Sequence, residues 1–193
     1  MRRIVVAISV LSLAVLILSS CTDQAQSPQQ TQQTTKAATP RPTIMLHPGV
    51  AVPASCPITP VYVGPFVNTP GLEDVPWMKA QPESSGMAAY LWFAGDYSQT
   101  HAYQPLPTGK PSKQGSGGKI LWIVDNPHST ISLDIAGEKL GGSHDTFQQT
   151  IPMAVSPPDN YPSIAYVPTP GCWRFNLKSG ADTATVVLWV VPY

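Results

Sequence analysis

The sequence predicts an all-β fold, an immunoglobulin-like antiparallel β-sandwich that follows a lipoprotein signal peptide and a disordered linker. Twenty-two prolines and fourteen glycines among 193 residues argue against long helices and favour short strands joined by turns. Short apolar or alternating segments recur along the chain at spacings typical of a sandwich. A partly closed barrel is the alternative, because the same alternation would serve either architecture.

The chain has few charged residues and no cluster of basic ones, which limits the partners that it can bind. Charged residues make up 11% of the sequence, well below the roughly 25% that is usual for soluble domains. Removal of residues 1–20 takes away Arg2 and Arg3, which leaves 9 basic residues against 11 acidic ones and a net charge of −2. No basic run is present in what remains. Phosphate binding needs clustered Lys and Arg, so we expect no nucleic-acid partner. We also expect no cofactor.

The N-terminus predicts export and a lipid anchor. Arg2 and Arg3 precede an apolar run over residues 4–18, which is shorter than the about 20 residues of a spanning helix and is typical of a signal-peptide core. The run ends in Leu-Ser-Ser-Cys, which resembles the lipobox of bacterial lipoproteins, in which the cysteine is acylated and becomes the first residue. Cys21 is then the lipidation site, and the membrane is a partner through that lipid. A plain secretory signal is the alternative.

A flexible linker is predicted after Cys21. Residues 22–41 contain no aromatic side chain and no aliphatic one larger than alanine, so this stretch cannot bury enough surface to fold. We therefore divide the chain into a signal peptide over residues 1–20, a lipidated cysteine with its linker over residues 21–45, and a sandwich domain over residues 46–193. The domain would be extracytoplasmic and tethered to the bacterial cell membrane.

Within the domain, the strands are predicted from alternation and from continuous apolar runs. They are residues 61–63 as an edge strand, 86–94, 119–124, 130–136, 146–153, 163–167, 173–178 and 183–191. Residues 125–129 are expected to close a hairpin between the third and fourth of these, and residues 137–142 to turn the chain. Residues 179–182 connect the last two strands into a C-terminal hairpin. Residues 68–85 and 95–118 are expected to be loop.

Two cysteines remain once Cys21 is lipidated. Cys56 and Cys172 form an even pair in an oxidising compartment, which favours a disulfide between the start of the domain and its last hairpin. The alternation of the strand places Cys172 opposite Trp173 and Phe175, away from the main core face. A reactive or metal-binding thiol is the alternative.

The sequence names no catalytic and no metal-binding residues. The four histidines show no ligand spacing, and no G-x-S-x-G nucleophile elbow is present. Aromatic side chains in predicted loops are more suggestive, because they could stack on a sugar or pack against a partner. The candidate ligand-binding residues are Trp77, Tyr97, His101 and Tyr103. Trp92, Trp122, Trp173 and Trp189 are interpreted as core or half-buried strand residues.

A resemblance adds to this picture. The stretch PTPGCW at residues 168–173 is followed by a strand, a glycine turn and an aliphatic strand. This ending, together with residues 56–59, 119–122 and 132–140, is similar to that of uncharacterised bacterial lipoproteins with an immunoglobulin-like domain. The resemblance implies a fold and carries no chemistry. We therefore expect a membrane-anchored binding module for a cell-wall glycan or another surface protein; a hydrolase acting on glycan or ester and a metal-handling lipoprotein are the alternatives.

Overall fold

The structure is a computed structural model, and it describes residues 42–66, 71–95, 97, 99–109, 118–125, 132–142, 144–156 and 158–193. The chain divides into two units, Met1–Ala38 and Thr39–Tyr193, and every described residue belongs to the second. The predicted signal peptide, Cys21 and most of the predicted linker lie outside the described residues. The first strand begins at Ile44, close to the predicted domain start at residue 46.

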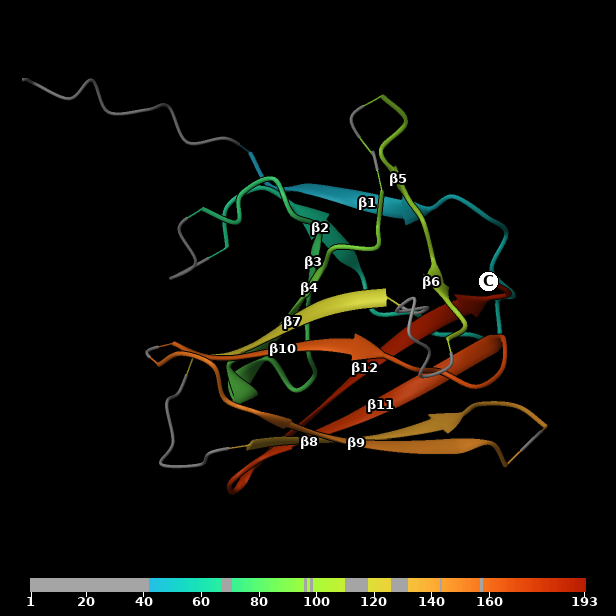
Figure 1. Ribbon diagram of the computed structural model, residues 1–193. Coiled ribbons are helices and arrows are strands. Elements are labelled where there is room, and N and C mark those ends of the chain that lie inside the picture. Colours follow the sequence, from blue (N-terminus) through green and yellow to red (C-terminus); the bar gives the residue numbers. More distant parts are fainter. Residues whose placement is uncertain are drawn as a thin grey trace, which may run out of the picture. The chain divides into compact units, whose positions relative to one another are not determined.

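Two β-sheets face each other, which confirms the predicted sandwich (Figure 1). The first sheet has seven strands in the order β10-β7-β4-β3-β2-β1-β5, and the second has five in the order β6-β12-β11-β8-β9. The strands are β1 (Ile44–Pro48), β2 (Val61–Val63), β3 (Trp77–Lys79), β4 (Met87–Leu91), β5 (Ala102–Tyr103), β6 (Leu106–Pro107), β7 (Gly118–Val124), β8 (Ser132–Lys139), β9 (Thr146–Pro152), β10 (Asp159–Ala165), β11 (Gly171–Ser179) and β12 (Asp182–Val191). Pairing is antiparallel except for β1 with β5 and β12 with β6.

The main core fills the space between the sheets. Trp122 of β7 in the first sheet and Phe175 of β11 in the second are fully buried, with ring centroids 6.3 Å apart. Phe147 of β9 packs edge-on against Phe175 at 5.0 Å and lies 5.8 Å from Trp173. Burial of such rings is the dominant favourable term in folding, because each removes a large apolar surface from water.

The predicted turn at residues 137–142 begins too early, because β8 continues through Gly137 to Lys139. A Cβ atom on Gly137 would lie 1.9 Å from a carbon of the Phe147 ring, which is the register partner of Gly137 on β9. The glycine therefore makes room for an aromatic side chain in the core and does not end the strand.

The predicted hairpin between residues 119–124 and 130–136 is wrong. The first segment is β7, which pairs with β4 and β10 in the first sheet, and the second is β8, which pairs with β9 and β11 in the second sheet. Alternation shows that each strand buries one face. It does not show whether two successive strands pair in the same sheet or lie in the two facing sheets, because one face is buried in both cases. Residues 126–131 of the connection lie outside the described residues.

A second apolar cluster lies on the outer face of the first sheet. Trp77, Tyr90 and Ile123 are buried there, and partly buried side chains that include Phe66 and Val75 pack over them. This cover explains why every residue of β4 is buried, since its alternate side chains point into the main core and into this cluster. The predicted edge strand at residues 61–63 is likewise internal, because β2 pairs with both β1 and β3.

One edge of β12 is paired by three short segments from the first half of the domain. Gln81 and Thr185 exchange two backbone hydrogen bonds of 2.9 and 2.7 Å. Thr59 donates its N–H to the carbonyl of Val187 at 2.9 Å, and its hydroxyl accepts the N–H of Val187 at 2.8 Å. β6 pairs with the last two residues of β12. These contacts satisfy backbone groups that an open edge would leave unpaired.

The C-terminal hairpin agrees with the sequence prediction. Two residues join β11 to β12, and the first of them is Gly180. Its φ of +60° is a left-handed backbone conformation that residues with a side chain rarely adopt. Cys172 lies on the opposite face of β11 from Trp173, Phe175 and Leu177, as predicted. Among the described residues, the structure contains no helix of the length and apolarity needed to cross a membrane.

The predicted disulfide is present. Cys56 and Cys172 are bonded across 116 residues of sequence, and their Cα atoms lie 5.6 Å apart. A bridge over so long a loop removes much of the entropy of the unfolded chain, which the chain-entropy model values at roughly 4 to 5 kcal/mol.

We expect the double substitution of Cys56 and Cys172 by serine to lower the free energy of unfolding by about 4 kcal/mol, measured by urea denaturation. Treatment of the unsubstituted protein with a thiol reductant should lower it by a similar amount. A reductant effect on the serine variant, or two titratable thiols in the unreduced folded protein, would contradict the assignment.

Candidate functional site

The four predicted ligand-binding residues do not form one exposed patch. Trp77 was expected in a loop, but it lies in β3 with 8% of its surface exposed. Its indole N–H donates to the carbonyl of Gly64 at 3.2 Å, and Tyr62 and Phe66 pack against its ring at centroid distances of 5.1 and 4.6 Å. The ring is therefore part of the apolar cluster on the outer face of the first sheet. The loop prediction failed here because a three-residue strand is too short to show a period.

Tyr103 is also buried, with 4% of its surface exposed, and lies in β5 beside β1. Burial raises the pKa of its phenol to about 12, because the charged form would lose its hydration. Tyr97 is half-buried and donates its hydroxyl to the carbonyl of Asp74. His101 is exposed, and its backbone N–H donates to the carbonyl of Tyr97 at 3.0 Å. Ligand binding by Tyr97 and His101 stays a prediction, while the rings of Trp77 and Tyr103 serve the fold.

Trp92 departs from the interpretation as a core or half-buried residue. It lies just beyond the end of β4 with 40% of its surface exposed, and the ammonium of Lys119 lies 5.2 Å from its ring centroid. That distance is within the range of a cation–π interaction. The contact accounts for the position of this cation without a ligand.

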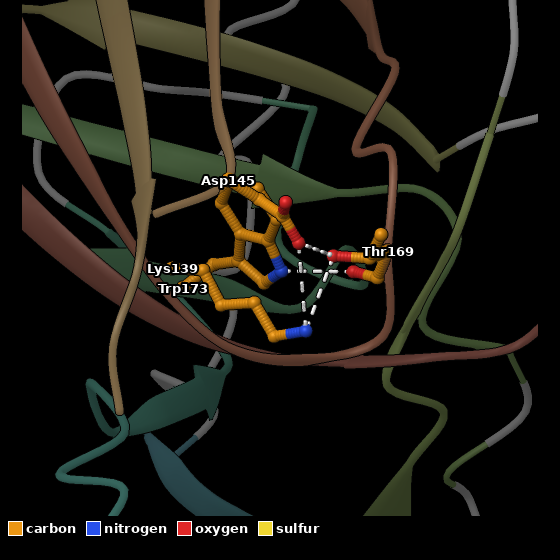
Figure 2. Close-up of polar contacts among 4 residues, drawn as sticks. All are labelled: Lys139, Asp145, Thr169 and Trp173. Atoms are coloured by element: carbon orange, nitrogen blue, oxygen red, sulfur yellow. Dashed lines mark hydrogen bonds and ion pairs between the residues drawn. The ribbon is translucent and has the colours of Figure 1, made fainter. Parts of the chain in front are cut away.

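The PTPGCW stretch is held by a polar cluster at one end of the second sheet (Figure 2). The hydroxyl of Thr169 donates to Asp145 at 2.7 Å and accepts from the ammonium of Lys139 at 3.2 Å. Lys139 and Asp145 form an ion pair at 3.7 Å. The indole N–H of Trp173 donates to the carbonyl of Thr169 at 2.8 Å. The cluster ties the segment before β11 to the end of β8 and to the residue that precedes β9.

The glycine of this motif has a steric role. Gly171 has a φ of +132°, and a Cβ atom on it would lie 2.8 Å from the side chain of Lys139. The next residue, Cys172, is in the disulfide, and its carbonyl accepts the N–H of Leu140 at 2.8 Å. Each polar or small residue of the motif thus has a structural partner, so the motif forms a scaffold for the domain.

No metal centre is found in the part of the chain that the structure describes. Of the four histidines, His47, His101 and His144 are described, and His128 lies outside the described residues. The described residues contain no group of three or more His, Cys, Asp or Glu side chains that could hold a metal ion.

A hollow of about 720 Å³ lies on the solvent face of the second sheet. Its floor is the outer face of β8, β9, β11 and β12, and its rim on the β12 side is formed by Gln81, which pairs with Thr185, and by Pro82. The volume is within the range of small-molecule sites. The described lining includes Asp134 as its one carboxylate and contains no histidine or cysteine.

Two rows of side chains cross this hollow from strand to strand. Along one row the register partners are Thr185, Asn176, Ala136 and Gln148. Along the other they are Thr183, Lys178, Asp134 and Thr150. Asp134 alternates with Leu133 and Ile135 in the sequence, and Asn176 and Lys178 alternate with Phe175 and Leu177, a pattern that indicates outward faces for these three polar residues. It could not show that these faces align, because alignment depends on which strands pair and in which register.

No family model, curated protein or solved structure matches this chain.

We expect Tyr103→Phe to reduce the loss of stability in alkali. The pKa of Tyr103 is higher in the folded state than in the unfolded state, so its phenol ionises more readily when the chain unfolds. The contribution of Tyr103 to the free energy of unfolding is therefore fully present below about pH 10 and is lost as the pH rises towards about 12. Unfolding by urea at pH 8 and at pH 11.5 should show a decline smaller in the variant by about 2 kcal/mol. Tyr193→Phe, at an exposed position, is the control. Equal declines in all three proteins would contradict the prediction.

Thr169→Val should destabilise the domain by about 1 to 2 kcal/mol, because it leaves Asp145 and Lys139 without the hydroxyl that joins them. Thr169→Ser keeps the hydroxyl and should retain most of the stability. Thr146→Val, at an exposed position of β9, serves as the matched control. A loss in Thr146→Val as large as that in Thr169→Val would assign the effect to the general cost of the substitution.

Proposed function

We propose that this protein is an extracytoplasmic lipoprotein that is anchored to the bacterial membrane through Cys21 and acts as a binding module. The address rests on the sequence: Arg2 and Arg3, the apolar run over residues 4–18, and the lipobox-like ending at Cys21. One acyl chain binds a membrane only marginally, whereas two or three give stable anchoring. The linker would then hold the domain away from the bilayer surface.

The disulfide supports this location. Cys56 and Cys172 are the only cysteines of the mature chain besides Cys21, and they are bonded to each other. Such bonds persist in oxidising compartments outside the cytoplasm and are rare inside it. The Pro168–Trp173 motif, with which the chain resembles bacterial lipoproteins, contributes one of these two cysteines.

The hollow on the second sheet is the observation that carries the binding function. It offers amides, hydroxyls and methyl groups on a rigid floor of paired strands. A hydrolase of the usual kind for glycans needs two carboxylates, and acyl transfer needs a nucleophile beside a base. Asp134 is the one carboxylate in the described lining, and its Oδ1 accepts the hydroxyl of Thr150 at 2.7 Å. This set of groups is suited to holding a ligand.

The anchor can be tested by metabolic labelling of cells with radioactive palmitate. The wild-type protein should incorporate label, and Cys21→Ser should incorporate none, because the acylated sulfur is absent. Cys56→Ser is the matched control and should stay labelled, since its sulfur is in the folded domain.

Label in the Cys21→Ser protein, or none in the wild type, would refute the anchor. The binding function would be refuted by turnover of an ester, glycan or peptide substrate that a single substitution abolishes.

A further inference from the structure

A ligand could contact the surface of the second sheet closely at the floor of the hollow. Ala136 lies near its centre, in the row that runs from Thr185 to Gln148, and its methyl group leaves the sheet surface open between longer side chains. The Gln81–Pro82 segment bounds it on the β12 side, and the β9 strand forms its far edge. A ligand that lies across the strands would thus meet side chains of four strands at once.

Two polar groups of the floor, Asn176 and Asp134, are held by hydrogen bonds to neighbouring side chains. The amide nitrogen of Asn176 donates to Glu138 at 3.3 Å, and Glu138 also pairs with Arg174 at 3.4 Å. The hydroxyl of Thr150 donates to Asp134 at 2.7 Å. Groups fixed in this way lose little freedom when a ligand binds, which favours affinity.

The chemistry of the lining selects for an uncharged ligand. Its polar side chains are mostly amides and hydroxyls, which both donate and accept hydrogen bonds. Asp134 and Lys178 are register partners of opposite charge, so the described lining has no net charge. Ile135, Leu177 and Ala184 of the lining have buried side chains, so the apolar groups that the outer face exposes are small: the methyl groups of Ala136 and of the threonines, and the ring of Pro82. Ligand hydroxyls would form hydrogen bonds with the amides and hydroxyls of the lining. The C–H faces between those hydroxyls would pack against its methyl groups and the ring of Pro82.

From these groups we infer that the hollow binds a neutral glycan. This inference rests on the proposed binding function and names its ligand class. A peptide fits less well, because peptides add to a sheet through a strand edge, and β8, β11 and β12 are paired on both sides here. A peptide added at the outer edge of β9 would lie beside the hollow and not across its floor. The apolar groups of the lining are also too small to form a deep pocket for a large peptide side chain. Sugar hydroxyls can form hydrogen bonds with the side chains of the floor and need no free strand edge.

The test uses the purified full chain in detergent and isothermal titration with neutral oligosaccharides: oligomers of N-acetylglucosamine, of glucose and of mannose. Galacturonic acid oligomers and an unstructured peptide serve as comparison ligands. We expect one neutral series to bind and the comparison ligands not to bind. Ala136→Trp, at an exposed position, should fill the hollow and weaken binding by at least about tenfold, while Gln148→Ala should weaken it about three- to tenfold.

Thr146→Trp is the matched control, because it adds the same ring to the same outer face at a position that does not line the hollow. It should bind as the wild type does, and urea unfolding should show that both tryptophan variants are folded. Absence of binding to every neutral series, or binding that survives Ala136→Trp, overturns the inference. Peptide binding that Ala136→Trp abolishes also overturns it, but leaves the binding module intact. Cleavage of a glycan that Asp134→Asn abolishes would refute the binding module itself.

Discussion

The pairing of one edge of β12 is the constraint on which the rest of the domain depends. Thr59, Gln81 and β6 come from three separate parts of the first half of the domain, and all three bond to the last strand. Because the main chain of β12 offers its groups at fixed intervals, each segment is held at a defined place along the strand. The first sheet is thereby fastened to the second by backbone hydrogen bonds as well as by the packing of Trp122 on Phe175.

The same pairing positions the disulfide and the hollow. The Thr59–Val187 bonds bring the preceding residues, which include Cys56, beside β11 and β12, where Cys172 lies on the outward face of β11. The Gln81–Thr185 bridge places Pro82 at the rim of the hollow. One covalent bond and one binding surface are thus consequences of how a single strand edge is covered.

Periodicity predicts most of the longer strands, although β10 begins at Asp159 and not at the predicted residue 163. β7, β8, β11 and β12 have seven to ten residues, and alternation or apolar runs located each of them. The two- and three-residue strands β3, β5 and β6 went unrecognised, so Trp77 and Tyr103 were placed in loops and interpreted as ligand-binding. Their burial comes from neighbours far apart in sequence, such as Gly64 for Trp77. Local pattern contains no information on such contacts.

The candidate site shows the same division between local and long-range information. Alternation indicates outward faces for Asp134, Asn176 and Lys178, but the hollow exists only because register aligns these residues into rows and because Gln81 reaches β12. In the motif at Pro168–Trp173, Thr169, Gly171 and Cys172 all hold the chain in place. A segment whose polar groups are satisfied internally has few left for a ligand. The outer face of the second sheet, where paired strands form a polar floor around Ala136, is therefore where ligand recognition is best supported.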